Sequence, residues 1–351
     1  MKELFDSIKH PNDHRVRSYP ENVQDERIPV YNSYLNDEVP IIEIKDLGKV
    51  CYTFEGVYYK NLQRIIEGSP YYFERTHPRA SEICRETPVQ KLKRLAKHLL
   101  FTKIYKEQEG FLAADYYSYS YYHWFSEALP RIYYGVLNRV SRKIFLPSIC
   151  SKYEYITESL KMFPEVEVVY LPNKSKVFIQ NAKWVSHAGK PYQFNTPLMR
   201  AYRKQIWTHY ETKTPSLRRS RIFVNRKKAT KRKLINEKEV LDVFKKHGFV
   251  IIDFEDYPWD EQIKLCHHAS IIAGIHGAGL TNMIFCPEDL VVFELQKKMN
   301  FASCFFRLSN AIGARYITQY SVEKFDTSES EVLSDIMIDI DELKKNLELI
   351  K

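Results

Sequence analysis

The sequence predicts an α/β protein with two domains, each built around a mainly parallel sheet. Its 351 residues suit two such domains better than one. From Ser118 onward, short β-branched segments alternate with segments of helical spacing, a pattern that is typical of parallel sheets. A polar stretch with Pro215, residues 211–219, interrupts this alternation and predicts the linker between the domains.

Residues 1–211 are predicted to form an N-terminal α/β domain with a strand-rich lead-in. The lead-in has apolar, strand-like runs at residues 39–44 and 50–54, and a basic segment of helical spacing at residues 91–100. Beyond it, helices are predicted at residues 121–137, 156–162 and 198–210. Strands are predicted at residues 143–146 and 166–171, with shorter extended segments at 177–179 and 184–185.

Residues 220–335 are predicted to form a second, very regular α/β domain, followed by a C-terminal helix within residues 336–351. Its strands are expected at residues 221–224, 249–254, 270–274, 290–295 and 315–320. Asn236 is expected to cap the first helix, with Glu239 as its capping-box partner, and Gly248 to end it. Pro258 is expected to open the next helix.

Composition excludes several classes of protein. The six cysteines are isolated and form no C-x-x-C pair, so neither a disulfide framework nor a zinc site is expected. No run approaches the roughly 18 apolar residues of a membrane span, and no secretory signal is evident. We therefore expect a cytoplasmic protein, with peripheral contact to the inner face of a membrane as an option.

Positive charge is concentrated beside the predicted linker. Residues 213–233 contain ten Lys and Arg and no Asp or Glu, within a formal net charge of +9. Such a cluster favours an anionic partner: a diphosphate, a nucleic acid or an anionic membrane surface. The alternative is a solvated linker, and the surrounding motifs favour the diphosphate.

The main motif is the segment His276–Gly277–Ala278–Gly279–Leu280, which follows an apolar strand and precedes a helix. Small residues at such a turn allow the backbone to approach a phosphate, which the helix N-terminus then binds. The His276 imidazole can donate to the same phosphate or to the sugar. Glycines at a strand–helix turn can also serve packing alone.

Three further residues support a nucleotide site in this domain. Glu294 ends the next strand and is placed to accept ribose hydroxyls. Arg226 follows the first strand of the domain and is therefore expected at the same sheet edge as Gly277. Its guanidinium suits a diphosphate because it can donate two parallel bonds, and Arg232 is expected to assist.

Two other nucleotide-binding classes fit less well. A dinucleotide-dependent oxidoreductase would need a third glycine at position 282, where Asn282 stands. A P-loop is excluded because the sequence contains no G-x-x-x-x-G-K-[ST].

A second cluster lies on the helix predicted at residues 121–137. His123, Glu127 and Arg131 are spaced four apart and share one face, and Pro130 is expected to kink the helix. A carboxylate beside an imidazole suits removal of a proton from a sugar hydroxyl. Glu127 is the preferred base, with His123 and Asp115 as further candidates. An exposed ladder of charges is the alternative.

Arg131 and Tyr122 are expected on the acceptor side of this site. Several tyrosines precede or begin the helix and could provide a surface for stacking against a sugar, or could belong to the core; they are Tyr116, Tyr117, Tyr119, Tyr121 and Tyr122.

Taken together, these motifs resemble glycosyltransferase family 61. The resemblance rests on H-W-x-x-E-x-L-P-R from His123 to Arg131, R-I-x-V-N-R from Arg221 to Arg226, R-K-L-I-N-E, and H-G-A-G-L-x-N-M-x-F from His276. It covers residues 117–320. It implies two Rossmann-like domains facing across a cleft (GT-B type), with the donor on the second domain and the acceptor in the cleft.

The resemblance also implies an activity. We expect an inverting glycosyltransferase that needs no metal and uses a nucleotide-sugar donor, UDP-linked by expectation. The bacterial branch of the family suggests a glycan or lipid-linked glycan acceptor in capsule, O-antigen or lipopolysaccharide synthesis. No nucleic-acid-binding module is present in the sequence, so a non-catalytic basic scaffold is a weaker alternative.

Overall fold

The protein forms two compact units. The computed structural model describes residues 1–15, 17–69, 71–72, 87–100, 103–187, 192–210, 220–298, 302–322 and 335–350. Unit 1 comprises residues 1–13 and 39–202, and unit 2 comprises residues 14–38 and 203–351. The expected boundaries assigned residues 14–38 and 203–210 to the first domain, whereas here they belong to unit 2. The predicted linker, residues 211–219, lies outside the described residues.

Unit 1 contains a seven-stranded mixed sheet in the order β3-β2-β1-β7-β4-β5-β6. The strands are β1 (Ile44–Thr53), β2 (Tyr58–Lys60), β3 (Gln63–Arg64), β4 (Lys103–Leu112), β5 (Lys143–Leu146), β6 (Glu167–Tyr170) and β7 (Ser175–Val185). The last four are mutually parallel where they pair, whereas β1 and β2 are antiparallel additions. The strand-rich lead-in therefore extends the sheet of the first unit.

Several strands of unit 1 differ from expectation. The central strand β4 was missed, because its first seven residues are largely exposed and charged and only its last three are buried. The two short segments predicted near residues 177 and 184 are parts of the single strand β7. Residues 39–43 are not in a strand; the chain joins the sheet only at Ile44.

The helices of unit 1 are α1 (Lys2–Lys9), α4 (Pro88–Leu100), α5 (Tyr121–His123), α6 (Leu129–Leu137), α7 (Glu154–Leu160) and α8 (Thr196–His209), the last continuing into unit 2. Short 3-10 turns occupy Pro11–His14, Ile66–Gly68 and Ser148–Lys152. The helix predicted at residues 121–137 is continuous, but its segment Trp124–Ala128 is a π-helix. Pro130, which cannot donate a backbone N–H bond to the preceding turn, is the second residue after it.

Unit 2 contains a five-stranded parallel sheet in the order β12-β11-β10-β8-β9. The strands are β8 (Ser220–Val224), β9 (Phe249–Ile252), β10 (Ala269–Ile275), β11 (Val291–Gln296) and β12 (Arg315–Tyr320). All five were predicted to within a few residues, because buried parallel strands appear in the sequence as short apolar runs.

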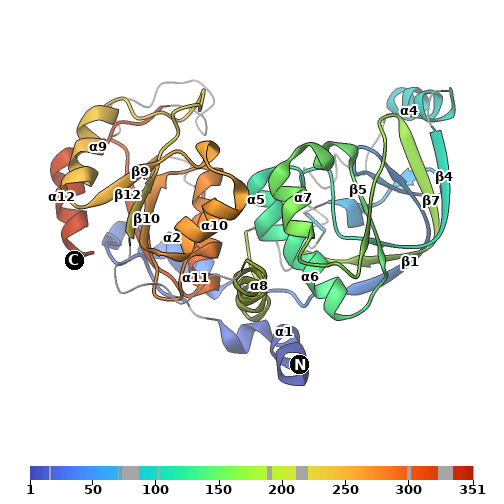
Figure 1. Ribbon diagram of the computed structural model, residues 1–351, viewed down its shortest axis with the longest axis horizontal. Helices are drawn as coiled ribbons and strands as arrows, with labels where there is room; N and C mark the ends of the chain where they lie inside the picture. Colours follow the sequence, from blue (N-terminus) through green and yellow to red (C-terminus); the bar gives the residue numbers. More distant parts are fainter. Residues whose placement is uncertain are drawn as a thin grey trace. The chain divides into compact units, whose positions relative to one another are not determined.

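Helices cover both faces of this sheet. They are α2 (Ile28–Asn36), α9 (Glu237–Lys246), α10 (Trp259–His267), α11 (Cys304–Ile312) and α12 (Ile340–Glu348), with 3-10 helices at Asp25–Arg27, Phe254–Asp256 and Ala278–Phe285, the last labelled η7. Helices α9 and α12 pack on one face through the main apolar core, and α10 and α11 lie on the other (Figure 1). Among the described residues, no helix is long and apolar enough to cross a membrane.

One predicted cap is wrong in detail. Helix α9 begins directly after Asn236, as expected, but the Asn236 side chain does not cap it. Instead, its amide exchanges two hydrogen bonds with the backbone of Ile338, at 2.8 and 3.1 Å. Asn236 therefore ties the segment before α12 to the start of α9.

Candidate functional site

The strand order of unit 2 places two loops of interest at one sheet edge. Strands β8 and β10 are parallel neighbours, but β8 is followed by a connection to β9 on one side and β10 by a connection to β11 on the other. Ligands of open α/β sheets bind at the carboxyl ends of such a strand pair. Arg226 follows β8 and His276 follows β10, so both lie at the carboxyl ends of this strand pair, as the sequence predicts.

Arg226 and Gly277 are in close contact here. The Arg226 guanidinium donates a hydrogen bond of 3.2 Å to the carbonyl oxygen of His276. A Cβ atom added to Gly277 would lie 3.0 Å from Arg226 Cζ, so glycine leaves the room that the guanidinium occupies. Burial and the nearby charge of Arg232 both lower the pKa of Arg226. Two guanidinium groups that repel one another at a sheet edge favour a bound anion between or beside them.

Arg232 carries two further signs of a functional position. Its backbone has φ of 57°, a left-handed conformation that is uncommon for residues other than glycine. Its Nε atom is buried without a hydrogen-bond partner among the described residues. Burial lowers the pKa of Arg232, against the opposing influence of Cys304 and Glu294. An anion would satisfy this donor.

His276 is oriented by a buried carboxylate. Its Nδ1 atom bonds to Glu294, whose other carboxylate oxygen accepts a hydrogen bond from the Tyr316 hydroxyl. Glu294 is fully buried, with both oxygens engaged. This arrangement favours a positioning role for Glu294 in place of the ribose contact expected from the sequence. It leaves His276 Nε2, the other ring nitrogen, as the atom for a ligand.

The glycine-rich turn leads into η7, a 3-10 helix where the sequence predicts a short helix. Ala278 at its start is exposed, whereas Leu280 is buried and its backbone N–H bonds to the Gly277 carbonyl at 3.0 Å. The far end of η7 is held by buried Arg203, which donates to the carbonyls of Ile284 at 3.0 Å and, just beyond, Pro287 at 3.1 Å. The N-terminus of η7 therefore lies at the same edge as Arg226.

The two glycines of the turn are expected to respond differently to substitution. A Cβ on Gly279 would lie 2.8 Å from the Val224 side chain in the core, so Gly279→Ala should cost about 1–3 kcal/mol of stability. Gly277 has an extended backbone that any residue adopts, and its neighbour Arg226 is flexible. Gly277→Ala should therefore fold normally but displace Arg226. Urea denaturation and nucleotide-binding assays on both variants test this; equal stability losses would contradict it.

The candidate base lies in unit 1, after two other parallel strands. Asp115 follows the carboxyl end of β4 and His187 follows that of its neighbour β7. Sequence reasoning missed His187. The only signal was a polar Ser-His pair directly after an apolar strand end.

His123 and Glu127 form the outer part of this cluster. His123 Nδ1 lies 2.7 Å from Glu127 Oε2, and the two side chains are 27% and 11% exposed. Burial opposes ionisation of His123, but the adjacent Glu127 carboxylate raises its pKa above the usual value. Glu127 lies on the π-helical segment, a feature frequently found at functional sites. The face that could have been an exposed charge ladder is therefore largely buried.

Asp115, Arg131 and His187 form the inner part. His187 Nε2 lies 3.1 Å from Asp115 Oδ2 and 3.2 Å from Arg131 Nη1, and all three side chains are buried. Burial opposes ionisation of Asp115, but the bond with His187 and the charge of Arg131 lower its pKa to about 2. Burial and Arg131 lower the pKa of His187. Asp115 is thus a poor proton acceptor at neutral pH.

The burial of these three residues favours a role in orienting Glu127 over direct contact with an acceptor. Arg131 also donates to the Val185 carbonyl at 2.9 Å, and His187 Nδ1 lies 4.0 Å from Glu127 Oε2. Since Arg131 is fully buried, we reassign it from acceptor contact to support of Asp115 and His187.

The tyrosines expected beside the base are partly surface and partly core. The Tyr117 ring lies 5.6 Å from the His123 ring, tilted by 34°, and Tyr116 is exposed. Tyr122 is buried against His123 and Tyr192. Tyr116 and Tyr117 are therefore better placed than Tyr122 to contact a sugar.

The His123–Glu127 pair predicts a pH-dependent contribution to stability. Because the folded pKa of His123 is raised above 6.5, the contribution is fully present below pH 6.5 and is lost as pH rises through the folded value. The stability difference between wild type and His123→Gln should reach roughly 1 kcal/mol just below pH 6.5, where Glu127 is still a carboxylate, and should shrink as the pH rises through the folded pKa of His123. Urea denaturation on both sides of pH 6.5 measures it; a difference that grows with pH would contradict the assignment.

Among the residues that the structure describes, no three or more His, Cys, Asp and Glu side chains are grouped so as to hold a metal ion. Positive charge at this edge of unit 2 includes the side chains of Arg226 and Arg232.

Two α/β units, one of them with a cationic, glycine-lined turn at its switch point, are compatible with a Rossmann-like glycosyltransferase fold. The family model described as Glycosyltransferase 61 matches residues 121–293. The match confirms the resemblance to glycosyltransferase family 61 that the sequence motifs indicate. It spans the residues from His123 and Glu127 through His187 to Arg226 and His276.

Curated relatives carry the name EGF domain-specific O-linked N-acetylglucosamine transferase. The protein from Gallus gallus is 26% identical over 191 residues, which are 48% of this chain and 36% of that protein. That from Drosophila melanogaster is 28% identical over 128 residues, 35% and 24% of the two chains. That from Xenopus laevis is 33% identical over 92 residues, 25% and 17%. This chain thus matches 36% or less of the length of each.

Proposed function

We propose that this protein is an inverting glycosyltransferase that moves a sugar from a nucleotide-sugar donor to a glycan hydroxyl. The observation that carries the proposal is the contact of Arg226 with Gly277 at the β8/β10 switch point, beside Arg232 and the oriented His276. These groups supply what a departing nucleoside diphosphate requires: fixed cations and donors at a sheet edge. The match to the family model supports glycosyl transfer as the reaction.

The reaction follows from the two clusters. A base from the His123–Glu127 pair removes the acceptor hydroxyl proton as that oxygen attacks the anomeric carbon of the donor sugar. The bond from the anomeric carbon to the diphosphate breaks on the opposite side, which inverts the configuration. The electron pair passes to the diphosphate, where Arg226 and Arg232 stabilise the negative charge. The GT-B arrangement of the two units is part of this proposal.

The proposed reaction needs no metal, because the guanidinium groups take the role that a divalent cation has in other transferases. The relatives' name makes UDP–N-acetylglucosamine the first donor to test. As acceptor we propose a glycan or lipid-linked glycan of bacterial surface polysaccharides, acted on at the cytoplasmic face of a membrane.

A nucleotide screen tests the proposal directly. UDP or a UDP-sugar should raise the melting temperature, since a ligand at about 100 times its Kd stabilises by about 2.7 kcal/mol. NAD(P) should have no effect, because the turn lacks the third glycine of a dinucleotide site. Stabilisation by NAD(P) alone would favour an oxidoreductase, and no response to any nucleotide would favour the scaffold.

The same preparation tests the metal proposal. Release of UDP from the donor should be unchanged in EDTA. Complete loss of turnover, restored by Mn²⁺ or Mg²⁺, would contradict a metal-independent reaction.

A further inference from the structure

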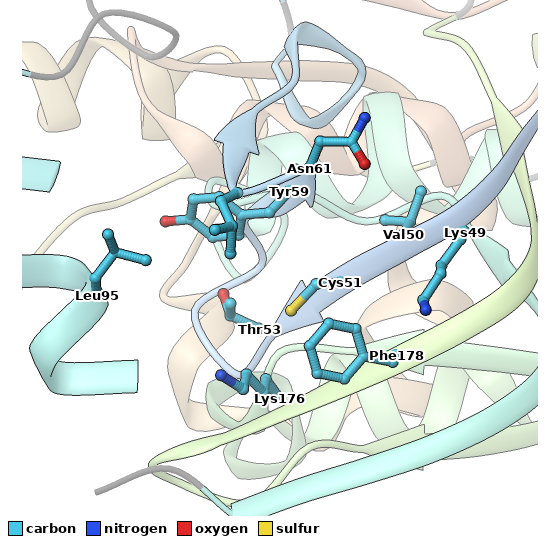
Figure 2. Close-up of a pocket in the computed structure, with 10 residues that line it drawn as sticks. Lys49, Val50, Cys51, Thr53, Tyr59, Asn61, Leu95, Lys176 and Phe178 are labelled. Atoms are coloured by element: carbon cyan, nitrogen blue, oxygen red, sulfur yellow. The ribbon is translucent and has the colours of Figure 1, made fainter. Parts of the chain in front are cut away.

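The sheet of unit 1 has a second face, and on it lies a pocket that has no part in the proposed transfer reaction. Residues of β1 and β7 alternate across the sheet: the paired Tyr52 and Val177 face the core, so the next pair, Cys51 and Phe178, faces the other way. On that opposite face, residues of β1, β2, β7 and α4 line a cavity of about 230 Å³ (Figure 2). Its lining is Lys49, Val50, Cys51, Thr53, Tyr59, Asn61, Leu62, Leu95, Lys176 and Phe178.

The pocket combines apolar walls with positive charge. Among the described residues that line it, none is acidic and two are lysines. Lys176 is buried, with its ammonium 5.6 Å from the centre of the Phe178 ring, and Lys49 is exposed at another side of the pocket. This lining fits an amphiphile with an anionic head and an apolar chain. The volume is below the roughly 300–1,000 Å³ that encloses a whole drug-sized ligand, so the pocket fits one end of a larger molecule.

The strand register extends this face beyond the pocket. Ile104 of β4 pairs with Lys176, and Lys106 pairs with Phe178, so both lie on the pocket side. Ile104 is 53% exposed, an apolar side chain open to solvent beside a lysine. Paired residues of parallel strands share one face. Exposed aliphatic and cationic side chains are therefore neighbours along it.

Helix α4, which contributes Leu95 to the pocket, has the same mixture. Its 13 residues include four Lys or Arg and no Asp or Glu. Val89 and Leu92 are 62% and 68% exposed, and Lys91 and Lys93 beside them are also exposed. Basic helices with exposed aliphatic side chains bind the interface of anionic membranes, whereas a nucleic acid would gain nothing from Val89 and Leu92.

We propose that this face of unit 1 docks on an anionic phospholipid membrane, with one lipid inserting a chain into the pocket and its phosphate near Lys49 and Lys176. The inference rests on unit 1 alone and does not depend on the transfer reaction. Membrane docking would bring a cytoplasmic enzyme to lipid-attached substrates, whatever their identity.

Vesicle flotation tests the surface. Wild type should bind phosphatidylcholine vesicles that contain phosphatidylglycerol, and bind pure phosphatidylcholine at least about fivefold more weakly. The double variant Lys91→Glu/Lys93→Glu should lose roughly 25-fold in partitioning, about fivefold for each lysine. Val89→Ser/Leu92→Ser should also weaken binding. Matched controls on exposed positions of unit 2, Lys245→Glu/Lys246→Glu and Val250→Ser, should bind like wild type.

Alkylation of Cys51 tests the pocket. Mass mapping of the Cys51 peptide after a short maleimide treatment should show slower modification with anionic vesicles and no change with neutral ones. If inorganic phosphate alone protects Cys51 from alkylation, the pocket binds free phosphate and the lipid proposal is wrong. Equal binding to both vesicle types, or equal loss in the unit 2 controls, would overturn the proposal.

Discussion

Replacing Glu127 with glutamine is expected to lower the turnover of sugar transfer about 10²–10⁴-fold, the range for a positioned general base. Glutamine keeps the shape and one acceptor atom, so the π-helical segment around it should persist. Nucleotide affinity should be nearly unchanged, because the nucleotide is assigned to unit 2. Single-turnover rates with saturating donor, together with a nucleotide Kd for each variant, separate the two effects.

The partner residues decide which atom takes the proton. If Glu127 is the base and His123 only orients it, His123→Gln should retain much of the rate, since the glutamine amide can still donate to the carboxylate. If His123 is the base, raised in basicity by Glu127, His123→Gln should lose as much as Glu127→Gln. Near-normal turnover in both variants would make the helix structural and move the search to Asp115 and His187.

Asp115 and His187 have a different expected signature. Asp115 is buried and has a pKa of about 2, so its carboxyl group is ionised at neutral pH. Asp115→Asn keeps the size of the side chain but removes the negative charge that holds Arg131 and His187. Asp115→Asn should therefore alter the pH dependence of turnover and also lower the stability of the protein. Loss of the catalytic base should lower turnover alone.

The sequence predicted unit 2 more completely than unit 1, for a physical reason. Strands such as β10 and β11 are buried on both faces and appear as apolar runs ended by Gly or polar residues. Strand β4 has charged, exposed residues over most of its length, so its position beside β7 depends on pairing with residues 72 positions away, as in Lys103 with Ser175. No local pattern indicates such pairing.

The site shows the same division between local and non-local information. The His123–Glu127 pair and the turn at Gly277 depend on spacing within one segment, so the sequence could indicate them. His187 reaches Asp115 only because β4 and β7 are neighbours, and Tyr316 reaches Glu294 only because β11 and β12 are. The burial of these side chains depends on tertiary packing, so the sequence could not indicate that they have positioning roles.

Replacing Arg226 with alanine is expected to weaken nucleoside diphosphate binding far more than folding. A charge-assisted bond contributes about 1.5–3 kcal/mol, so the Kd should rise roughly 10- to 150-fold. Stability should change by about 1 kcal/mol or less, since the bonds of the Arg226 guanidinium within the described part of the chain are to two backbone carbonyls, and Arg232 repels it. Isothermal titration with UDP and urea denaturation of the free protein measure the two quantities.

Two matched variants make this result specific to the guanidinium. Lys228→Ala removes a cation from the same loop, one that is exposed and bonded to Asp256, and should leave the Kd within about twofold of wild type. Arg226→Lys keeps the charge but not the fork that binds two phosphate oxygens, and should lie between wild type and alanine. An unchanged Kd in Arg226→Ala would mean that the basic cluster is a solvated linker. Arg226 contacts the turn at Gly277, whereas Lys228 does not. Equal losses of affinity in Arg226→Ala and Lys228→Ala would therefore mean that net charge, and not this contact, binds the diphosphate.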